Sequence, residues 1–253
     1  MKNVTLTALV AVLVFGCKGK TEKANPEIDS APMQQEKVET PVEQEWTVLF
    51  DGTSFDGWHG YLMDKVPDAW KLEDGAMVLT PPTDKSERGP HLNLISDKDY
   101  TDFVLSLEWK ISEAGNSGIF WGIKEDKKYK EPYNTGPEIQ VLDNEHHPDA
   151  KNGTTHQAGS LYDMIAPSKD VTKPVGEWNT CVITVNHKTN EGKVELNGEV
   201  IVNFPVEGEK WDAMVAKSKF ADWEGFGKFH TGKIGLQYHG DVVSYRNIKI
   251  KEL

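Results

Sequence analysis

One segment, residues 103–111, constrains the fold of this chain more than any other, because its apolar side chains recur at every second position. The intervening residues are mostly polar, and the apolar members are Phe103, Leu105, Leu107, Trp109 and Ile111. A period of two is typical of a β-strand that buries one face and exposes the other. Such a strand needs a second layer of structure to cover its apolar face.

Short β-rich segments separated by Gly, Asn, Asp and Pro fill most of the remaining chain. The segments that favour strands are 76–80, 118–123, 138–142, 178–185, 193–197, 234–238 and 246–250. Asn197-Gly198 predicts a type I′ hairpin. The one helix expected is short and lies between Glu209 and Lys219. Many strands and dense turns predict an all-β sandwich of two packed antiparallel sheets.

The N-terminus has the pattern of an export signal. A charged start, Met1-Lys2-Asn3, precedes an apolar run over 6–15, which is shorter than the roughly 20 residues that span a bilayer. Residues 13–17 resemble the bacterial lipobox, so we expect 1–17 to be a lipoprotein signal peptide and Cys17 to carry lipid. An ordinary signal peptide is the alternative. The lipoprotein reading predicts anchoring in the bacterial cell envelope, in the periplasm or on the outer-membrane surface.

Composition separates a tether from a folded domain and restricts the partners. Residues 18–44 are polar and contain three prolines, so they are expected to be a disordered tether before a domain over 45–253. The net charge of −12 disfavours nucleic acid and anionic membrane surfaces as partners. A small neutral ligand fits this charge better.

Polar residues at alternate strand positions are the first candidates for a site. Glu138 and Gln140 alternate with Ile139 and Val141, so they share one strand face. Gln237 and His239 are also two positions apart, so they are expected to share a strand face near the C-terminus. Asp143 has the opposite parity to Glu138 unless a bulge intervenes. The alternative is that these residues only line a solvated sheet face.

Histidines and aromatic residues extend the candidate site. The loop after residue 142 contains His146, His147 and His156, and a histidine serves near neutral pH as a general base or a metal ligand. Adjacent histidines without helical spacing are a weak metal signal, so no cofactor is required and a divalent metal is only an open alternative. Trp121 and Tyr162 adjoin the polar segments and are expected to stack on sugar rings.

Several segments in the same order resemble the 3-keto-disaccharide hydrolase domain family, formerly known only as a domain of unknown function. They are 49–52, 55–58, 116–120, 136–144, 159–163, 232–240 and 245–248. The resemblance implies a concanavalin-like jelly roll and cleavage of the glycosidic bond of 3-keto-disaccharides. This chain departs from the family at Tyr238, where the family has Asp.

The activity implied by the resemblance assigns roles to these residues. A ketone at C3 acidifies the C2 proton. The site therefore needs a base, a hydrogen-bond donor that stabilises the enolate, and an acid. Either His147 or His239 is the candidate base, and either Glu138 or Asp143 is the candidate acid or orienting carboxylate. The residues expected to bind substrate or donate to it are Asn116, Trp121, Gln140, Tyr162, Gln237 and Arg246.

Two other functions remain open on the same fold. The spacing of Glu138, Gln140 and Asp143 is similar to the acidic cluster of jelly-roll glucanases, which predicts a conventional retaining glycosidase. The middle acid is replaced by Gln140 here. A carbohydrate-binding lipoprotein without catalysis is the other alternative, because a fold does not prove an activity.

Overall fold

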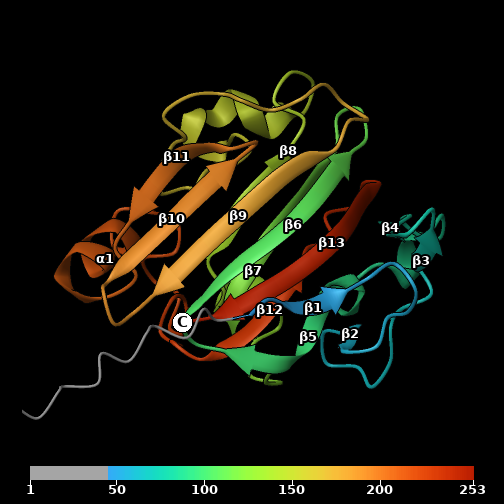
Figure 1. Ribbon diagram of the computed structural model, residues 1–253, viewed down its shortest axis with the longest axis horizontal. Helices are drawn as coiled ribbons and strands as arrows, with labels where there is room; N and C mark the ends of the chain where they lie inside the picture. Colours follow the sequence, from blue (N-terminus) through green and yellow to red (C-terminus); the bar gives the residue numbers. More distant parts are fainter. Residues whose placement is uncertain (1–44) are drawn as a thin grey trace, which may run out of the picture. The chain divides into compact units, whose positions relative to one another are not determined.

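The computed structural model describes residues 45–253 as two antiparallel β-sheets packed face to face (Figure 1). The predicted signal peptide, Cys17 and the predicted tether lie outside the described residues. The predicted jelly-roll sandwich is confirmed. Within residues 45–253, no helix is long and apolar enough to cross a membrane.

The larger sheet has eight strands and contains the segment with the clearest alternation. In order across the sheet, seven strands are β11 (Glu199–Phe204), β10 (Glu191–Leu196), β9 (Asn179–Asn186), β6 (Phe103–Ile111), β13 (Val243–Glu252), β4 (Ala76–Leu79) and β3 (Trp70–Glu73). The eighth, β1 (Thr47–Phe50), pairs with the far end of β13. Strand β6 buries every second residue, as its period of two predicts.

The smaller sheet has five strands and carries the polar segments singled out from the sequence. Its order is β2 (Trp58–Gly60), β5 (Leu94–Tyr100), β12 (Gly232–Leu236), β7 (Asn116–Ile123) and β8 (Glu138–Leu142). All pairings are antiparallel. Strand β8 is therefore an edge strand.

Apolar side chains from the facing sides of both sheets form the core. Leu105, Trp109 and Tyr245 of the larger sheet belong to the same buried cluster as Ile139 and Leu236 of the smaller sheet. Burial of this apolar area is the main favourable contribution to folding. Because side chains alternate along a strand, the residues between the core positions of β7, β8 and β12 face away from the larger sheet.

Short helices occur in the connections. The 3₁₀ helices are η1 (Lys85–Glu87), η2 (Pro90–Leu92), η3 (Pro132–Asn134), η4 (Pro148–Asn152) and η5 (Thr154–His156). The expected short helix is α1 (Gly208–Val215). The predicted hairpin joins β10 to β11, and positive φ angles of 51° at Asn197 and 85° at Gly198 match a type I′ turn.

Candidate active site

A cavity of about 510 Å³ lies over the face of the smaller sheet that points away from the core. Strands β7 and β8 and the segment after β12 form its floor, and the connections around η2, η3 and residues 219–223 form its walls. The titratable and amide side chains that line it are Asn93, Asn116, Glu131, Tyr133, Glu138, Gln140, Tyr162, Lys219, Gln237, Tyr238 and His239. A hollow of this volume with polar groups that converge on it is typical of a small-molecule site.

The segment 159–162 runs along the free edge of β8 and completes one wall. The backbone amide of Gly159 donates to the backbone carbonyl of Gln140 at 2.8 Å, and the backbone amide of Tyr162 donates to the backbone carbonyl of Glu138 at 3.0 Å. This pairing explains why every residue of β8 is buried although β8 is an edge strand. It also fixes Tyr162 next to Glu138.

Glu138 is a buried carboxyl that points into the cavity. Burial raises its pKa to about 8; nearby Lys219 opposes this rise, and Asp149 adds to it. Its carboxylate occupies the space directly above Gly118, where any Cβ would collide with it. Among the described residues, none donates a hydrogen bond to this carboxyl. Glu138 is therefore largely protonated at neutral pH and is suited to general-acid catalysis.

Four buried polar atoms at the cavity have no hydrogen-bond partner within residues 45–253. They are Asn116 Oδ1, Gln140 Oε1, Gln237 Oε1 and the Tyr238 hydroxyl. Buried polar groups in folded proteins are almost always paired, so such a cluster indicates a ligand that supplies the missing partners. A sugar carries several hydroxyl donors and would satisfy the three amide oxygens.

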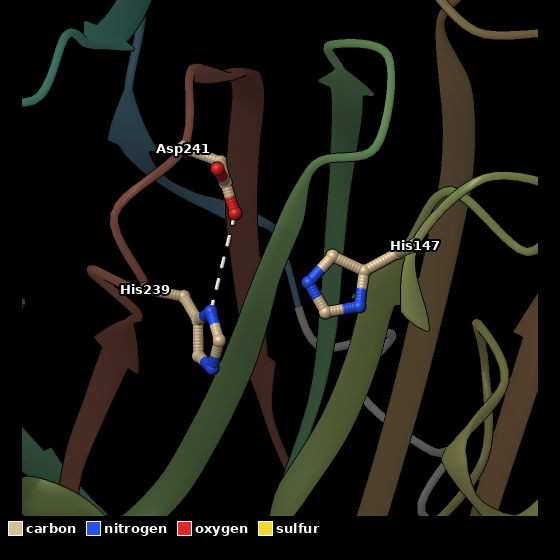
Figure 2. A group of neighbouring side chains, drawn as sticks. All are labelled: His147, His239 and Asp241. Carbon is tan, nitrogen blue, oxygen red and sulfur yellow. Dashed lines mark ion pairs between the residues drawn. The ribbon is translucent and has the colours of Figure 1, made fainter. Parts of the chain in front are cut away.

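His147, His239 and Asp241 form a cluster (Figure 2), and His239 also lines the cavity. His239 Nδ1 is 3.9 Å from Asp241 Oδ2. This carboxylate oxygen also accepts a hydrogen bond from the backbone amide of Asn116 at 3.1 Å. The rings of His147 and His239 meet edge to face, with centroids 5.9 Å apart. At 3.9 Å the two side chains form an ion-pair contact but no hydrogen bond, so Asp241 places a carboxylate beside His239.

The hydrogen bonding of His147 favours proton donation over metal ligation. Its Nδ1 accepts the amide of Asp149 at 3.1 Å, so in the neutral ring the hydrogen is on Nε2. Burial and the neighbouring His239 lower the pKa of His147, which keeps the ring neutral. The three side chains could surround a divalent ion, but Nε2 of His147 could bind one only by losing its hydrogen and the bond from Asp149.

An aromatic wall closes the other side of the cavity. Trp223 packs on Tyr133 with centroids 5.8 Å apart and on Phe220 at 5.0 Å. Glu131 lies beside this wall, and burial raises its pKa to about 7. Aromatic faces stack on the apolar face of a sugar ring, so the wall is suited to one ring of a disaccharide.

Comparison with known proteins agrees with this geometry. Residues 45–251 match the 3-keto-alpha-glucoside-1,2-lyase-like domain. The chain belongs to this family. It is 37% identical over 243 residues to a 3-keto-disaccharide hydrolase of Bacteroides thetaiotaomicron, covering 87% of this chain and 83% of the relative. The resemblance found in the sequence is confirmed.

Solved structures support the family assignment. A crystal structure assigned to a glycosyl hydrolase of Parabacteroides distasonis is 31% identical, with a TM-score of 0.73 over 82% of this chain and 94% of the other. A second from the same organism is 25% identical, with a TM-score of 0.57 over 82% and 84% of the two chains. The family and these relatives place the chain among enzymes that hydrolyse glycosidic bonds.

Most of the expected site residues meet at this cavity. Those that line it are Asn116, Glu138, Gln140, Tyr162, Gln237 and His239. His147 lies beside His239. Gln140 differs in one respect from its expected role as a hydrogen-bond donor to the enolate. Its amide nitrogen faces Asp149 Oδ2 at 3.5 Å and the His156 carbonyl at 3.4 Å, so the group left free is an acceptor.

Trp121 and Arg246 lie outside the cavity. Trp121 has the parity of the core residue Ile119, is 6% exposed and packs on Phe204 at 5.7 Å between ring centroids. Arg246 pairs with Glu108 at 2.7 Å on the solvent face of the larger sheet. Neither side chain contributes to the cavity lining.

Asp143 also lies outside the cavity and holds a turn together. Its carboxylate accepts the amide of Ala114 at 2.8 Å and the amides of Glu145 and His146 at 3.1 and 3.2 Å. Burial would raise the pKa of Asp143, but these bonds outweigh it and lower the pKa. An ionised, fully bonded carboxylate is poorly suited to donate a proton, which leaves Glu138 as the candidate acid.

Sequence reasoning missed several cavity residues because they come from irregular connections. Glu131, Lys219, Phe220 and Tyr238 line the cavity, and Asp241 lies beside His239. Tyr238 has the core parity of Ile234 and Leu236 in the sequence pattern, and the others belong to no alternating pattern, which was the main signal used for β8 and β12. The dense run of aromatic residues at 220–226 is the one signal in the sequence that points to the aromatic wall.

Proposed function

We propose that this family member cleaves the glycosidic bond of 3-keto-glycosides by elimination followed by hydration. One observation carries the proposal: a protonated, buried Glu138 and His239 line the same cavity. The side-chain amide oxygens of this cavity lack hydrogen-bond partners among the described residues. One group is ready to give a proton and the other to take one. The names of the family and of the Bacteroides relative support the substrate class.

His239 starts the proposed reaction. Oriented by Asp241, it removes the proton from C2 of the keto sugar, and the electron pair moves onto the C3 oxygen to form an enolate. The Gln237 amide and Nε2–H of His147 are the candidate donors to that oxygen. Donors aimed at a developing oxyanion are among the largest contributions to catalysis.

Glu138 completes the cleavage. When the enolate returns to a ketone, a C1–C2 double bond forms and the C1–O bond breaks, and Glu138 protonates the departing oxygen. Water then adds at C1 and gives its proton to the Glu138 carboxylate, while His239 returns a proton to C2. The sum is 3-keto-glycoside plus water to 3-keto sugar plus alcohol, with both residues restored to their starting states.

The electrostatics of the cavity disfavour a conventional retaining mechanism. That mechanism needs one carboxyl as an acid and a second that stays ionised as nucleophile. Burial raises the pKa of Glu138 to about 8 and that of Glu131 to about 7, so neither carboxyl in the cavity is held in the ionised form. A reaction that uses an imidazole base and a carboxylic acid fits these groups better.

The test compares a 3-keto-disaccharide with its unoxidised parent in deuterated water, following release of the leaving sugar. We expect cleavage of the keto sugar alone, with deuterium at C2 of the product. Cleavage of the parent without exchange at C2 would establish a conventional glycosidase. Binding of the parent with no cleavage of either sugar would establish a carbohydrate-binding protein. Loss of activity in a chelator, restored by a divalent ion, would make the histidine cluster a metal site.

A further inference from the structure

His156 lies just outside the cavity and joins two loops that build its wall. It ends η5, and its side chain is 14% exposed. Nδ1 is 3.0 Å from Asp149 Oδ1, and Nε2 is 3.0 Å from Asp163 Oδ1. The imidazole therefore forms a tie between one carboxylate on η4 and another on the segment that runs along β8.

The two contacts define the charge on the imidazole. An ionised carboxylate only accepts hydrogen bonds, so a ring nitrogen facing one must carry a hydrogen. Burial would raise the pKa of Asp149, but hydrogen bonds from Asn152, Tyr162 and His156 outweigh it and lower the pKa. Asp163 already accepts the Lys219 amide at 2.7 Å. Each ring nitrogen of His156 faces a carboxylate oxygen, so satisfying both contacts takes a hydrogen on both nitrogens.

Each carboxylate of the tie holds a residue of the cavity wall. Asp149 Oδ2 accepts the Tyr162 hydroxyl at 2.9 Å. Asp163 fixes the backbone of Lys219, whose Nζ lies 4.1 Å from the centre of the Tyr162 ring. Tyr162 pairs with the backbone of Glu138, and the Lys219 charge opposes the rise in the pKa of Glu138. Tyr162 therefore affects the proposed acid, Glu138, through the backbone contact, and Lys219 affects it through its charge.

We propose that His156 is a positioning residue, which as an imidazolium joins Asp149 to Asp163 and thereby holds Tyr162 and Lys219 beside Glu138. The kinetic part of this inference rests on the proposed function. Without the positive charge, the carboxylates of Asp149 and Asp163 lose their common partner, and the two wall residues are no longer fixed relative to Glu138. A displacement of this kind lowers the rate without removing a group that touches the reacting atoms.

The test measures kinetics and thermal stability of the full chain for His156→Gln and His156→Asn. Each substitution keeps a donor for one carboxylate and removes the charge. We expect kcat/KM for a 3-keto-disaccharide to fall on the order of 10- to 100-fold, mostly in kcat. The matched control is His187→Asn, because His187 is also a poorly exposed histidine bonded to a carboxylate, Asp102, at 3.0 Å, but lies away from the cavity.

A double-mutant cycle with Tyr162→Phe separates positioning from general support of the fold. We expect the effect of His156→Asn to shrink when the Tyr162 hydroxyl is absent, because the two changes interrupt the same chain of contacts. Fully additive effects, or a loss of activity no larger than that of His187→Asn, would overturn the proposal. If the His156 variants do not fold, Asp163→Asn breaks the same tie from its other end.

An observation that needs no catalysis keeps this inference distinct from the proposed function. Nitrogen NMR should show a hydrogen on both ring nitrogens of His156 at neutral pH, and His156→Asn should shift the Lys219 amide resonance whereas His187→Asn should not. A neutral ring, or an unmoved Lys219 amide, rejects the positioning role even in an active enzyme. Failure of the wild type to cleave any 3-keto-glycoside, with these signals present, rejects only the proposed function.

Discussion

At the scale of single residues, Glu138 carries a conflict between stability and activity. Its folded pKa of about 8 lies above the ordinary 4.5, so the folded protein keeps a proton that the unfolded chain releases in this range. The free energy of unfolding therefore falls as pH rises from about 4.5 to about 8. The cavity keeps an acid in the form that can donate a proton, and retaining this proton above pH 4.5 lowers the free energy of unfolding.

The first prediction follows from this conflict. Glu138→Gln should lower kcat by about 10²- to 10⁴-fold while raising the free energy of unfolding at pH 8 by on the order of 1 to 3 kcal/mol. The gain should vanish as the pH falls below 4.5, where the carboxyl is protonated in the folded and unfolded states alike. Wild-type activity should fall above pH 8. Denaturant melts and pH–rate profiles measure both effects, and a variant that is destabilised at pH 8 would contradict the burial of an unpaired carboxyl.

A second prediction concerns the base. His239→Gln should lower cleavage of the keto sugar by about 10²- to 10⁴-fold and should abolish hydrogen exchange at C2 in parallel. Asp241→Asn should reduce both rates by a smaller factor, because it disturbs only the orientation of the ring. Exchange is read from the deuterium content of product and recovered substrate.

The control for the base is His146→Gln. His146 is next to His147 in the sequence, but it pairs with Asp143 at 2.9 Å outside the cavity, so its loss should leave both rates unchanged. If exchange at C2 persists in His239→Gln, another group removes the proton, and His147 is the next candidate.

At the scale of elements, strand parity explains why Trp121, which was expected to stack on a sugar ring, lies in the core whereas Trp223 lines the cavity. Trp121 lies on the core face of β7, whereas Trp223 lies in a loop and forms part of the aromatic wall. We predict that Trp223→Ala raises KM for disaccharides severalfold with little change in thermal midpoint. Trp121→Ala should cost about 3 to 5 kcal/mol of stability by opening a core cavity. Kinetics and thermal melts on the pair decide the matter, and a stable Trp121→Ala protein with raised KM would reverse the assignment.

Parity also explains how much of the site could be predicted from the sequence. Glu138 and Gln140 could be placed on one face because β8 alternates regularly, and the same reasoning brought Gln237 and His239 to the cavity. Applied to Trp121, it gives the core face, since this residue is two positions from Ile119. Periodicity ends with the strands, so nothing in the pattern could place Lys219.

At the scale of the whole molecule, the jelly roll separates support from chemistry. The larger sheet and the core face of the smaller sheet supply the buried apolar area, while the cavity uses only the outer face of the smaller sheet and its connections. Partial charges and unpaired amides can therefore accumulate at the site without opening the core. The segment along β8 shows the same division, because its backbone bonds cover an edge strand and its Tyr162 side chain enters the cavity.

The location of the enzyme is the last prediction, and it depends on residues outside the described domain. We propose that Cys17 is lipid-modified and anchors the chain in the bacterial envelope, because an apolar run of export-signal length ends at Gly16-Cys17. Intact mass of the membrane fraction should show acyl groups on a chain that begins at Cys17, and Cys17→Ser should move the protein to the soluble fraction with unchanged kcat. A soluble wild type without acyl groups would contradict the anchor. Unchanged kcat in the released protein is expected because the catalytic groups all lie within 45–253, and a released protein with altered kcat would mean that the anchor segment takes part in the site.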